Sequence, residues 1–220
     1  MKYLKNLILS FREIFLLFIL QYAIIISCLF IFGMDKSIII GSIFICIIEI
    51  IYVIFKYKGK KIKVEQYNLF PYILLGIGIT TTYNMILFAM NLGNEVNTNI
   101  NIVFNIICSG IVGPIFEETL FRYSFINYLK KFNNTKMSII ISSIVFAICH
   151  TGITTIMYAF IIGLVNSYLY IKKKNILVPI VIHMSANIFV NILNSYNLYV
   201  LVIGIFLVIL STIIIRNCKD

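Results

Sequence analysis

Two adjacent glutamates, Glu117 and Glu118, lie inside an apolar stretch and are followed by Arg122. Glu118 and Arg122 are four residues apart, so on a helix they share a face and can form an ion pair. Glu117 is turned by about 100° on the same helix and is left for a different neighbour. Because a charge inside a bilayer costs roughly 2.5–3.5 kcal/mol on insertion scales, this cluster indicates a buried polar site that performs chemistry or moves an ion.

The chain has only two histidines, His150 and His183, and both lie in later apolar stretches. Phe146 precedes His150 by four residues and Asn187 follows His183 by four, so each pair is expected to share a helix face. Together with Glu117 they provide a general base, a histidine partner and two hydrogen-bond donors. This set suits acyl transfer to water, in which Glu117 and His150 activate the water and His183 and Asn187 stabilise the oxyanion.

The same residues also have interpretations other than acyl transfer. A membrane histidine is often only a helix–helix hydrogen bond, and Glu118 with Arg122 can be a structural ion pair. Glu117, His150 and His183 could ligate zinc with an open water position, although the sequence contains no H-E-x-x-H signal. Buried glutamates and histidines also serve transporters and proton relays.

The composition predicts the class of fold that must position these residues. Of the 220 residues 61% are hydrophobic and 12% are charged, and the mean hydropathy is +1.02. These values are typical of a polytopic membrane protein, and we predict an all-α transmembrane helix bundle forming a single integral membrane domain over residues 1–220. Eight apolar segments are long enough to span or nearly span a bilayer; they lie near 14–33, 37–55, 69–91, 102–126, 137–152, 154–171, 176–194 and 198–215.

The helix count depends on the short turn Thr151-Gly152 between the fifth and sixth segments. If these two segments form one kinked helix, the bundle has seven helices and not eight. The distribution of charge supports eight, because placing both termini in the cytoplasm puts all 18 Lys and Arg except Lys36 on the cytoplasmic side. The basic residues lie in short clusters between apolar runs, so the net charge of +10 indicates membrane topology and not a nucleic-acid partner.

The three motifs in their order resemble the CPBP family, also called the Abi family, which contains CAAX prenyl proteases and bacteriocin-processing or immunity proteins. The motifs are E-E-x-x-x-R at 117–122, F-x-x-x-H at 146–150 and H-x-x-x-N at 183–187. The resemblance covers about residues 70–195, the expected protease core, and includes a stretch of small residues at 160–170. It implies an intramembrane endopeptidase of the cell membrane whose site is reached from the cytoplasm.

The resemblance also implies roles for residues. Glu117 and His150 would activate the water, and His183 and Asn187 would form the oxyanion hole. A glutamate-type mechanism without metal is favoured for CAAX members, so no cofactor is expected and zinc is the alternative.

The remaining motif residues, Glu118 and Arg122, would support the first glutamate. The implied partners are the lipid bilayer and a peptide or protein substrate at the membrane, such as a bacteriocin-like peptide or a membrane protein. A non-catalytic membrane immunity or scaffold protein is the main alternative function, and a transporter or proton relay is the third.

Overall fold

The structure, a computed structural model, describes residues 2–60, 68–92, 101–193 and 197–217. Within these ranges the regular elements are helices and no strand occurs, so the predicted all-α bundle is confirmed. Some basic residues used to predict the orientation, Lys61, Lys63 and Lys219, lie outside the described ranges, as do residues 93–100 of the loop between the third and fourth segments.

The first helix, α1 (Lys2–Tyr57), consists of two apolar arms, Tyr3–Met34 and Lys36–Tyr57. Between them Gly33 adopts φ 72°, a left-handed conformation that glycine reaches without steric cost. The arms are joined by a hydrogen bond from Gln21 Nε2 to Glu49 Oε1 of 3.1 Å. The α1 element is therefore a hairpin of two helices.

The first arm of α1 begins well before the predicted start near residue 14. Its leading residues pack on the helices that follow in the chain. Tyr3 lies edge-on to Phe132 with ring centroids 5.6 Å apart, and Phe11 contacts Phe125 at 5.4 Å. These aromatic contacts stabilise the basic N-terminal segment as a helix. The charge pattern of the segment alone did not predict this.

One long helix, Ile102–Leu129, carries the glutamates and changes its hydrogen-bond pattern twice. It consists of α3 (Ile102–Asn105), the π-helix η1 (Ile106–Val112), α4 (Gly113–Glu118), the π-helix η2 (Thr119–Ile126) and α5 (Asn127–Leu129). The other helices are α2 (Phe70–Ala89), α6 (Thr135–Ile148), α7 (Ile153–Lys173), α8 (Leu177–Ile192) and α9 (Leu198–Asn217). Counting both arms of α1, the described residues form eight helices, as predicted; six are long and apolar enough to span a membrane, and α6 and α8 are shorter.

The turn between α6 and α7 decides between seven and eight helices. Helix α6 ends at Ile148, and Gly152 at φ 84° begins α7. His150 therefore lies in the turn, beyond the end of α6, and not on its helical face as the sequence predicted. The reason is that the positive φ of Gly152 reverses the chain three residues after the α6 C-cap, Cys149.

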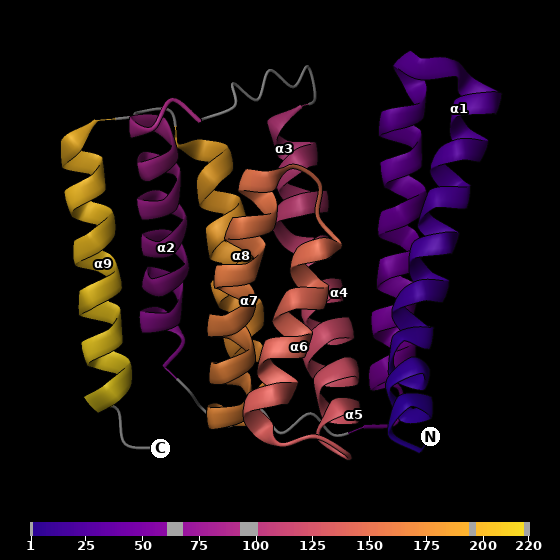
Figure 1. Ribbon diagram of the computed structural model, residues 1–220. Helices are drawn as coiled ribbons and strands as arrows, with labels where there is room; N and C mark the ends of the chain where they lie inside the picture. The colour runs from indigo at the N-terminus through magenta and orange to yellow at the C-terminus, as the bar shows by residue number, and fades with distance from the viewer. Residues whose placement is uncertain (1, 61–67, 93–100, 194–196, 218–220) are drawn as a thin grey trace.

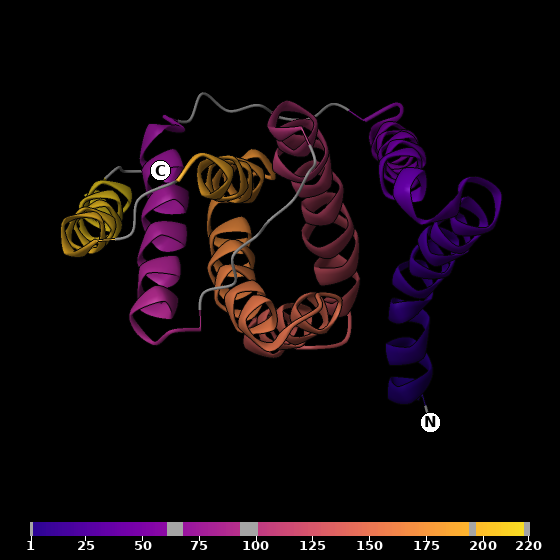
Figure 2. The ribbon, with the colours of Figure 1, turned by 90° about the horizontal axis from the view of Figure 1, so that it is seen from above.

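Figures 1 and 2 show the long helix Ile102–Leu129 together with α6, α7 and α8 in the middle of the bundle, with the α1 hairpin on one side and α2 and α9 on the other. Small residues allow the close packing. A Cβ added at Gly76 of α2 would clash with the carbonyl oxygen of Ile182 in α8, and one at Gly163 of α7 would lie 3.3 Å from Phe146 of α6. Glycine at these points lets the helices approach backbone to backbone.

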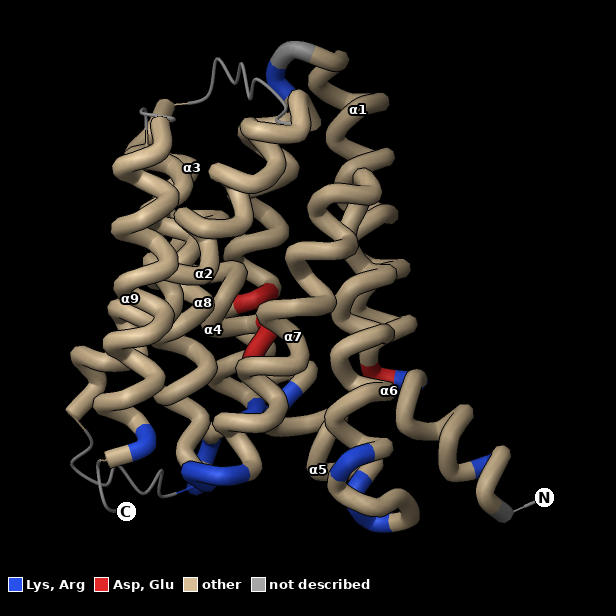
Figure 3. Tube along the Cα trace, turned by 60° about the vertical axis from the view of Figure 1, so that its left-hand side comes forward, with Lys and Arg blue, Asp and Glu red and all other residues tan. Residues whose placement is uncertain are grey.

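The charges mark the two ends of the bundle. Figure 3 shows most Lys and Arg gathered at the end where the chain termini lie. We call this the basic end; it includes Lys130, Lys174 and Arg216 at the ends of α5, α7 and α9. The opposite end is called the Thr151 end after its turn residue. That the basic end faces the cytoplasm stays a prediction of the positive-inside rule.

Candidate active site

The two glutamates lie where the long helix changes its hydrogen-bond pattern. Helix α4 ends at Glu118 and η2 starts at Thr119, while η1 ends at Val112 just before α4. Pro114 lies at the start of α4, directly after η1, and has no N–H to donate to the preceding turn. π-Helical turns inside longer helices occur frequently at functional sites. The local backbone therefore marks this segment independently of its charges.

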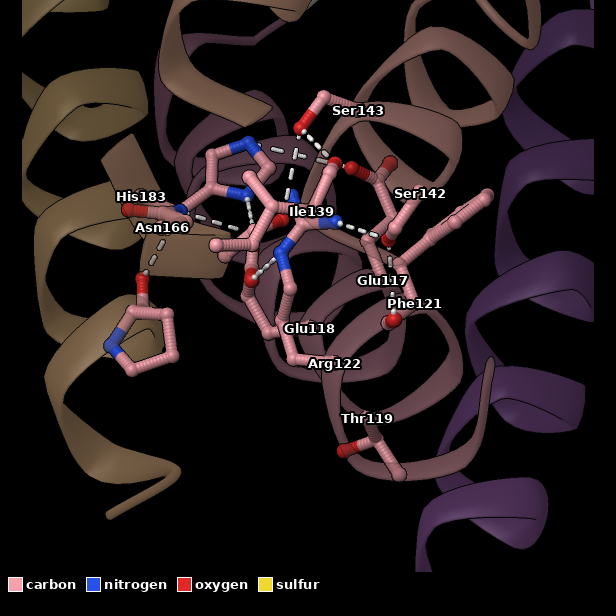
Figure 4. A network of polar contacts seen from close by, with 12 residues as sticks. Glu117, Glu118, Thr119, Phe121, Arg122, Ile139, Ser142, Ser143, Asn166 and His183 are labelled. Carbon is pink, nitrogen blue, oxygen red and sulfur yellow. Dashed lines mark hydrogen bonds and ion pairs between the residues drawn. The ribbon is translucent and has the colours of Figure 1, made fainter. Parts of the chain in front are cut away.

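Glu118 is completely buried and is bound by three side chains from three helices (Figure 4). Its Oε2 lies 2.9 Å from Nε of Arg122, which confirms the ion pair predicted from their spacing. Its Oε1 accepts a hydrogen bond from Asn166 Nδ2 at 3.0 Å and lies 2.9 Å from His183 Nδ1. Buried charge is tolerated when it is paired and hydrogen-bonded in this way.

Arg122 is also completely buried. Its Nη1 donates to Ser142 Oγ at 3.2 Å, and the Ser142 hydroxyl donates in turn to the carbonyl oxygen of Phe121. The guanidinium carbon lies 4.8 Å from the ring centroid of Phe146, a distance suited to a cation–π contact. The cation is thus held by a carboxylate, a hydroxyl and an aromatic face, and it anchors Glu118 from the side of the basic end.

His183 connects the buried carboxylate to the accessible one. Because a carboxylate only accepts hydrogen bonds, the contact with Glu118 places a proton on Nδ1 of His183. Its Nε2 then faces Glu117 Oε2 at 3.8 Å, within ion-pair range but longer than a hydrogen bond. The side chain of Glu117 is 30% exposed whereas that of Glu118 is fully buried, so Glu117 is the glutamate that water can reach.

His150 is held by its own chain. Its Nδ1 lies 2.8 Å from the carbonyl oxygen of Phe146, an acceptor, so this nitrogen carries the proton and Nε2 is left as a basic lone pair. The Phe146 ring contacts both histidines, with centroid distances of 4.8 Å to His150 and 5.8 Å to His183. The structure thus brings His183 next to Glu117, and the pairing of His150 with Glu117 stays a prediction.

Asn187 lies one turn from His183 on α8 and contacts the long helix. Its Nδ2 donates to the carbonyl oxygen of Ser109 in η1 at 2.9 Å. An amide nitrogen carries two N–H groups, so this bond leaves a second donor for another acceptor. The oxyanion role predicted for Asn187 is compatible with this contact and stays a prediction.

Asn166 and Ser142 belong to the network although the sequence-based prediction did not assign them to the site. Asn166 is fully buried in α7, and its Nδ2 also approaches the carbonyl oxygen of Pro179 at 3.3 Å. Pro179 falls in the first turn of α8 and does not kink it. The available signal was an amide in the middle of an otherwise apolar helix, which in a membrane calls for a polar partner.

Zinc ligation by Glu117, His150 and His183 is the alternative interpretation of these residues. Among the described residues no three His, Cys, Asp or Glu side chains are arranged to hold a metal ion. His183 contacts Glu118 through Nδ1, so its Nε2 is the nitrogen on the side of Glu117. Zinc binding therefore stays an alternative prediction.

The fold and the site together define a multi-pass membrane helix bundle with a buried Arg–Glu–His network beside one accessible carboxylate. Residues 99–189, which contain all three motifs, match the family described as type II CAAX prenyl endopeptidase Rce1-like. The match covers less than half of the chain and supports the resemblance of its motifs to the CPBP family.

Three curated relatives share part of their length with this chain. The putative membrane peptidase YdiL of Bacillus subtilis is 38% identical over 88 residues, 40% of this chain and 36% of YdiL. The membrane-embedded CAAX protease MroQ of Staphylococcus aureus is 29% identical over 157 residues, 62% and 63% of the two chains. The UPF0177 protein YxdF of Lactococcus lactis is 35% identical over 81 residues, 36% and 44%. The matches thus span less than two thirds of each relative, and no solved structure matches.

Proposed function

We propose that this chain is an intramembrane endopeptidase that hydrolyses a peptide bond in a membrane-associated peptide or protein. One observation carries the proposal: Arg122, Glu118 and His183 form a continuous buried network that ends at the accessible carboxylate of Glu117. A purely structural ion pair would not require a histidine aimed at a second, exposed glutamate. The family match and the relatives named as a peptidase and a CAAX protease support the same reaction class.

Glu117 is proposed as the general base. It takes a proton from a water molecule as the water oxygen attacks the substrate carbonyl, and the proton is later given to the leaving amine. The basic Nε2 of His150 is the proposed partner in activating the water. General base catalysis of this kind contributes typically 10²–10⁴-fold to the rate.

His183 and Asn187 are proposed to stabilise the oxyanion. The second N–H of Asn187 is one donor. His183 donates through Nε2 when it carries both ring protons, a form that the contacts of its two nitrogens with Glu118 and Glu117 favour. Each such donor is worth about 10²–10³ in kcat. Glu118 is a positioning residue in this scheme, because it acts through His183.

No metal takes part in the proposed reaction. The substrate class follows only from the membrane setting and from the family, so we propose a bacteriocin-like peptide or a membrane protein and leave the sequence around the cleaved bond to experiment.

Terminal-peptide proteomics on host cells tests the proposal and does not require the substrate to be identified first. Cells producing the wild type are compared at matched expression with cells producing Glu117→Gln, which keeps the shape and removes the base. Glu13→Gln is the matched control, because Glu13 lies on α1 and pairs with Lys56. New termini should appear with the wild type and the control and be absent with Glu117→Gln.

Two results would overturn the proposal. An immunity phenotype that survives in Glu117→Gln, with no termini that depend on Glu117, would favour the scaffold function. Ion flux in proteoliposomes that requires Glu117 would favour a transporter or proton relay.

A further inference from the structure

The second arm of α1 carries a buried glutamate, Glu49, that the proposed mechanism does not use. The residue is 7% exposed, and its Oε1 accepts the hydrogen bond from Gln21 Nε2 on the first arm. It lies outside residues 99–189, the part of the chain that the family match covers. The role of Glu49 must therefore be argued from its own surroundings.

The partner of Glu49 differs from those of the other glutamates that the structure describes. Each of the other three faces a basic side chain; these pairs are Glu13 with Lys56, Glu117 with His183 and Glu118 with Arg122. Within the described ranges Glu49 has only the uncharged amide of Gln21 as its hydrogen-bond partner, and no cation pairs with it. An ionised carboxylate buried without a cation is so costly that the group takes up a proton instead.

The second arm of α1 runs beside the long helix that carries Glu117 (Figures 1 and 2). Tyr52 lies three residues after Glu49, so the two side chains lie on nearly the same face of the arm. The Tyr52 ring is edge-on to that of Phe116, with centroids 5.3 Å apart, and Phe116 directly precedes Glu117. The Tyr52 hydroxyl lies 3.2 Å from Ser124 Oγ, further along the same helix. These contacts bring the face that holds Glu49 to the level of Glu117.

The carboxyls of Glu49 and Glu117 are close enough to influence each other's charge. Two carboxylates that share a site repel each other, so one of them keeps a proton. The other titratable groups around the two are Cys46 and Cys108 beside Glu49, and Arg122, Cys149 and His183 around Glu117. The only basic groups in this set, Arg122 and His183, both lie on the side of Glu117, whose side chain is also 30% exposed. Glu117 is therefore the member of the pair that can ionise at the lower cost.

From this arrangement we infer that Glu49 is a second carboxyl of the site, which holds a proton at neutral pH and leaves the negative charge of the pair on Glu117. Glu49 is a positioning residue, because it acts through Glu117: its neutral form covers the base with a polar group and adds no repelling charge. The α1 hairpin thereby contributes to the site. The inference rests on the proposed function for the role of Glu117 as a base, whereas the proton on Glu49 follows from the contacts alone.

Dicyclohexylcarbodiimide, an apolar reagent, tests for the proton on Glu49. A carboxylic acid adds across one C=N bond of the reagent and its proton passes to the nitrogen; the acyl group then moves from oxygen to nitrogen and leaves a stable N-acylurea. An ionised carboxylate lacks the proton for this addition. The purified chain is treated at neutral pH, and peptide mass spectrometry locates the modified glutamates. Glu13 and Glu117 are internal controls, because their side chains are 38% and 30% exposed and each faces a basic group.

We expect at least about ten times more label on Glu49 than on Glu13 or Glu117, the factor that one pH unit represents. Glu49→Gln should lose the label. The label on Glu49 should disappear as the pH is raised, and Glu117→Gln should move the midpoint of this loss to lower pH by about one unit, because the repelling charge is removed. A glutamate with a purely structural role would not respond to Glu117 in this way.

Two results would overturn the inference: label on Glu49 at acidic pH only, or a midpoint that Glu117→Gln leaves unchanged. If Glu117→Gln does not fold, the comparison of glutamates in the wild type decides alone. If the reagent modifies Glu49 at no pH, infrared spectroscopy decides, because the carbonyl band of a protonated carboxyl must be present at neutral pH in the wild type and absent from Glu49→Gln. Neither measurement requires turnover, so a failure of proteolysis and a failure of this inference are distinguishable.

Discussion

Replacing Arg122 with methionine should destabilise the protein by about 3 kcal/mol, because it leaves the buried carboxylate of Glu118 without its cation. Breaking a buried pair by removing one partner costs about 3–5 kcal/mol. The lower end applies here, since Asn166 and His183 still bind Oε1 of Glu118 while only Oε2 loses its partner. Methionine keeps the apolar stem of the arginine, so the loss of packing is small.

The shift in melting temperature follows from the size of the chain. One kcal/mol corresponds to about 2–4 °C for 150–250 residues, so the expected decrease is about 6–12 °C. The double variant Glu118→Gln, Arg122→Met removes both charges and should recover most of this loss. The interaction energy in the double-mutant cycle should then be about 1.5–3 kcal/mol.

The assay uses purified protein and a thiol-reactive fluorogenic dye, because the chain has no tryptophan and Cys28 is buried until the bundle unfolds. Arg216→Met is the matched control, since Arg216 is an exposed arginine near the end of α9. A melting temperature of Arg122→Met within about 2 °C of the wild type would refute the reasoning. So would a double variant no more stable than the single one.

Three further outcomes are expected. Asn166→Leu should lower the free energy of unfolding by about 1–3 kcal/mol, because it leaves Oε1 of Glu118 without its amide donor. The similarly shaped Asn166→Asp should melt lower still, because it sets a second carboxylate beside Glu118. Equal melting temperatures for the two variants would contradict this account. Gly76→Ala should lower both the melting temperature and kcat, because the added Cβ clashes with the backbone of Ile182 beside His183, whereas a loss of stability with kcat intact would contradict the link to the site. Chelation with EDTA should leave the rate of cleavage unchanged in protein whose zinc content is measured by mass spectrometry, and a loss of rate that zinc restores would establish a metal mechanism.

The helices and the central ion pair were predictable from the sequence because both depend on local patterns. Apolar runs of spanning length fix the helices whatever their neighbours are. The spacing of four residues between Glu118 and Arg122 is enough to place them on one face, and their contact follows.

The rest of the site depends on which helices are neighbours, and the sequence carries no such information. Asn166 and Ser142 bind the ion pair from α7 and α6, so their role appears only when the helices are packed. His183 of α8 faces Glu117 of the long helix at 3.8 Å, and no spacing along the chain predicts this contact. His150 lies in the turn because α6 ends at Ile148. The π-helical turns were not predicted. Over so short a distance, Glu117, Glu118 and Arg122 have nearly the same relative orientation in a π-helix as in an α-helix.

The π-helix η1 rotates the part of the long helix before it relative to the part after it. Its hydrogen bonds reach one residue further than those of an α-helix, so the segment before it is rotated by about one residue, or 100°. Deleting a single residue from 106–112 would let an ordinary α-helix form there. Asn105 and Ser109 would then turn away from α8 while Glu117, Glu118 and Arg122 kept their places. In this way the contacts between η1 and α8 can change during evolution while the network around Glu118 is kept.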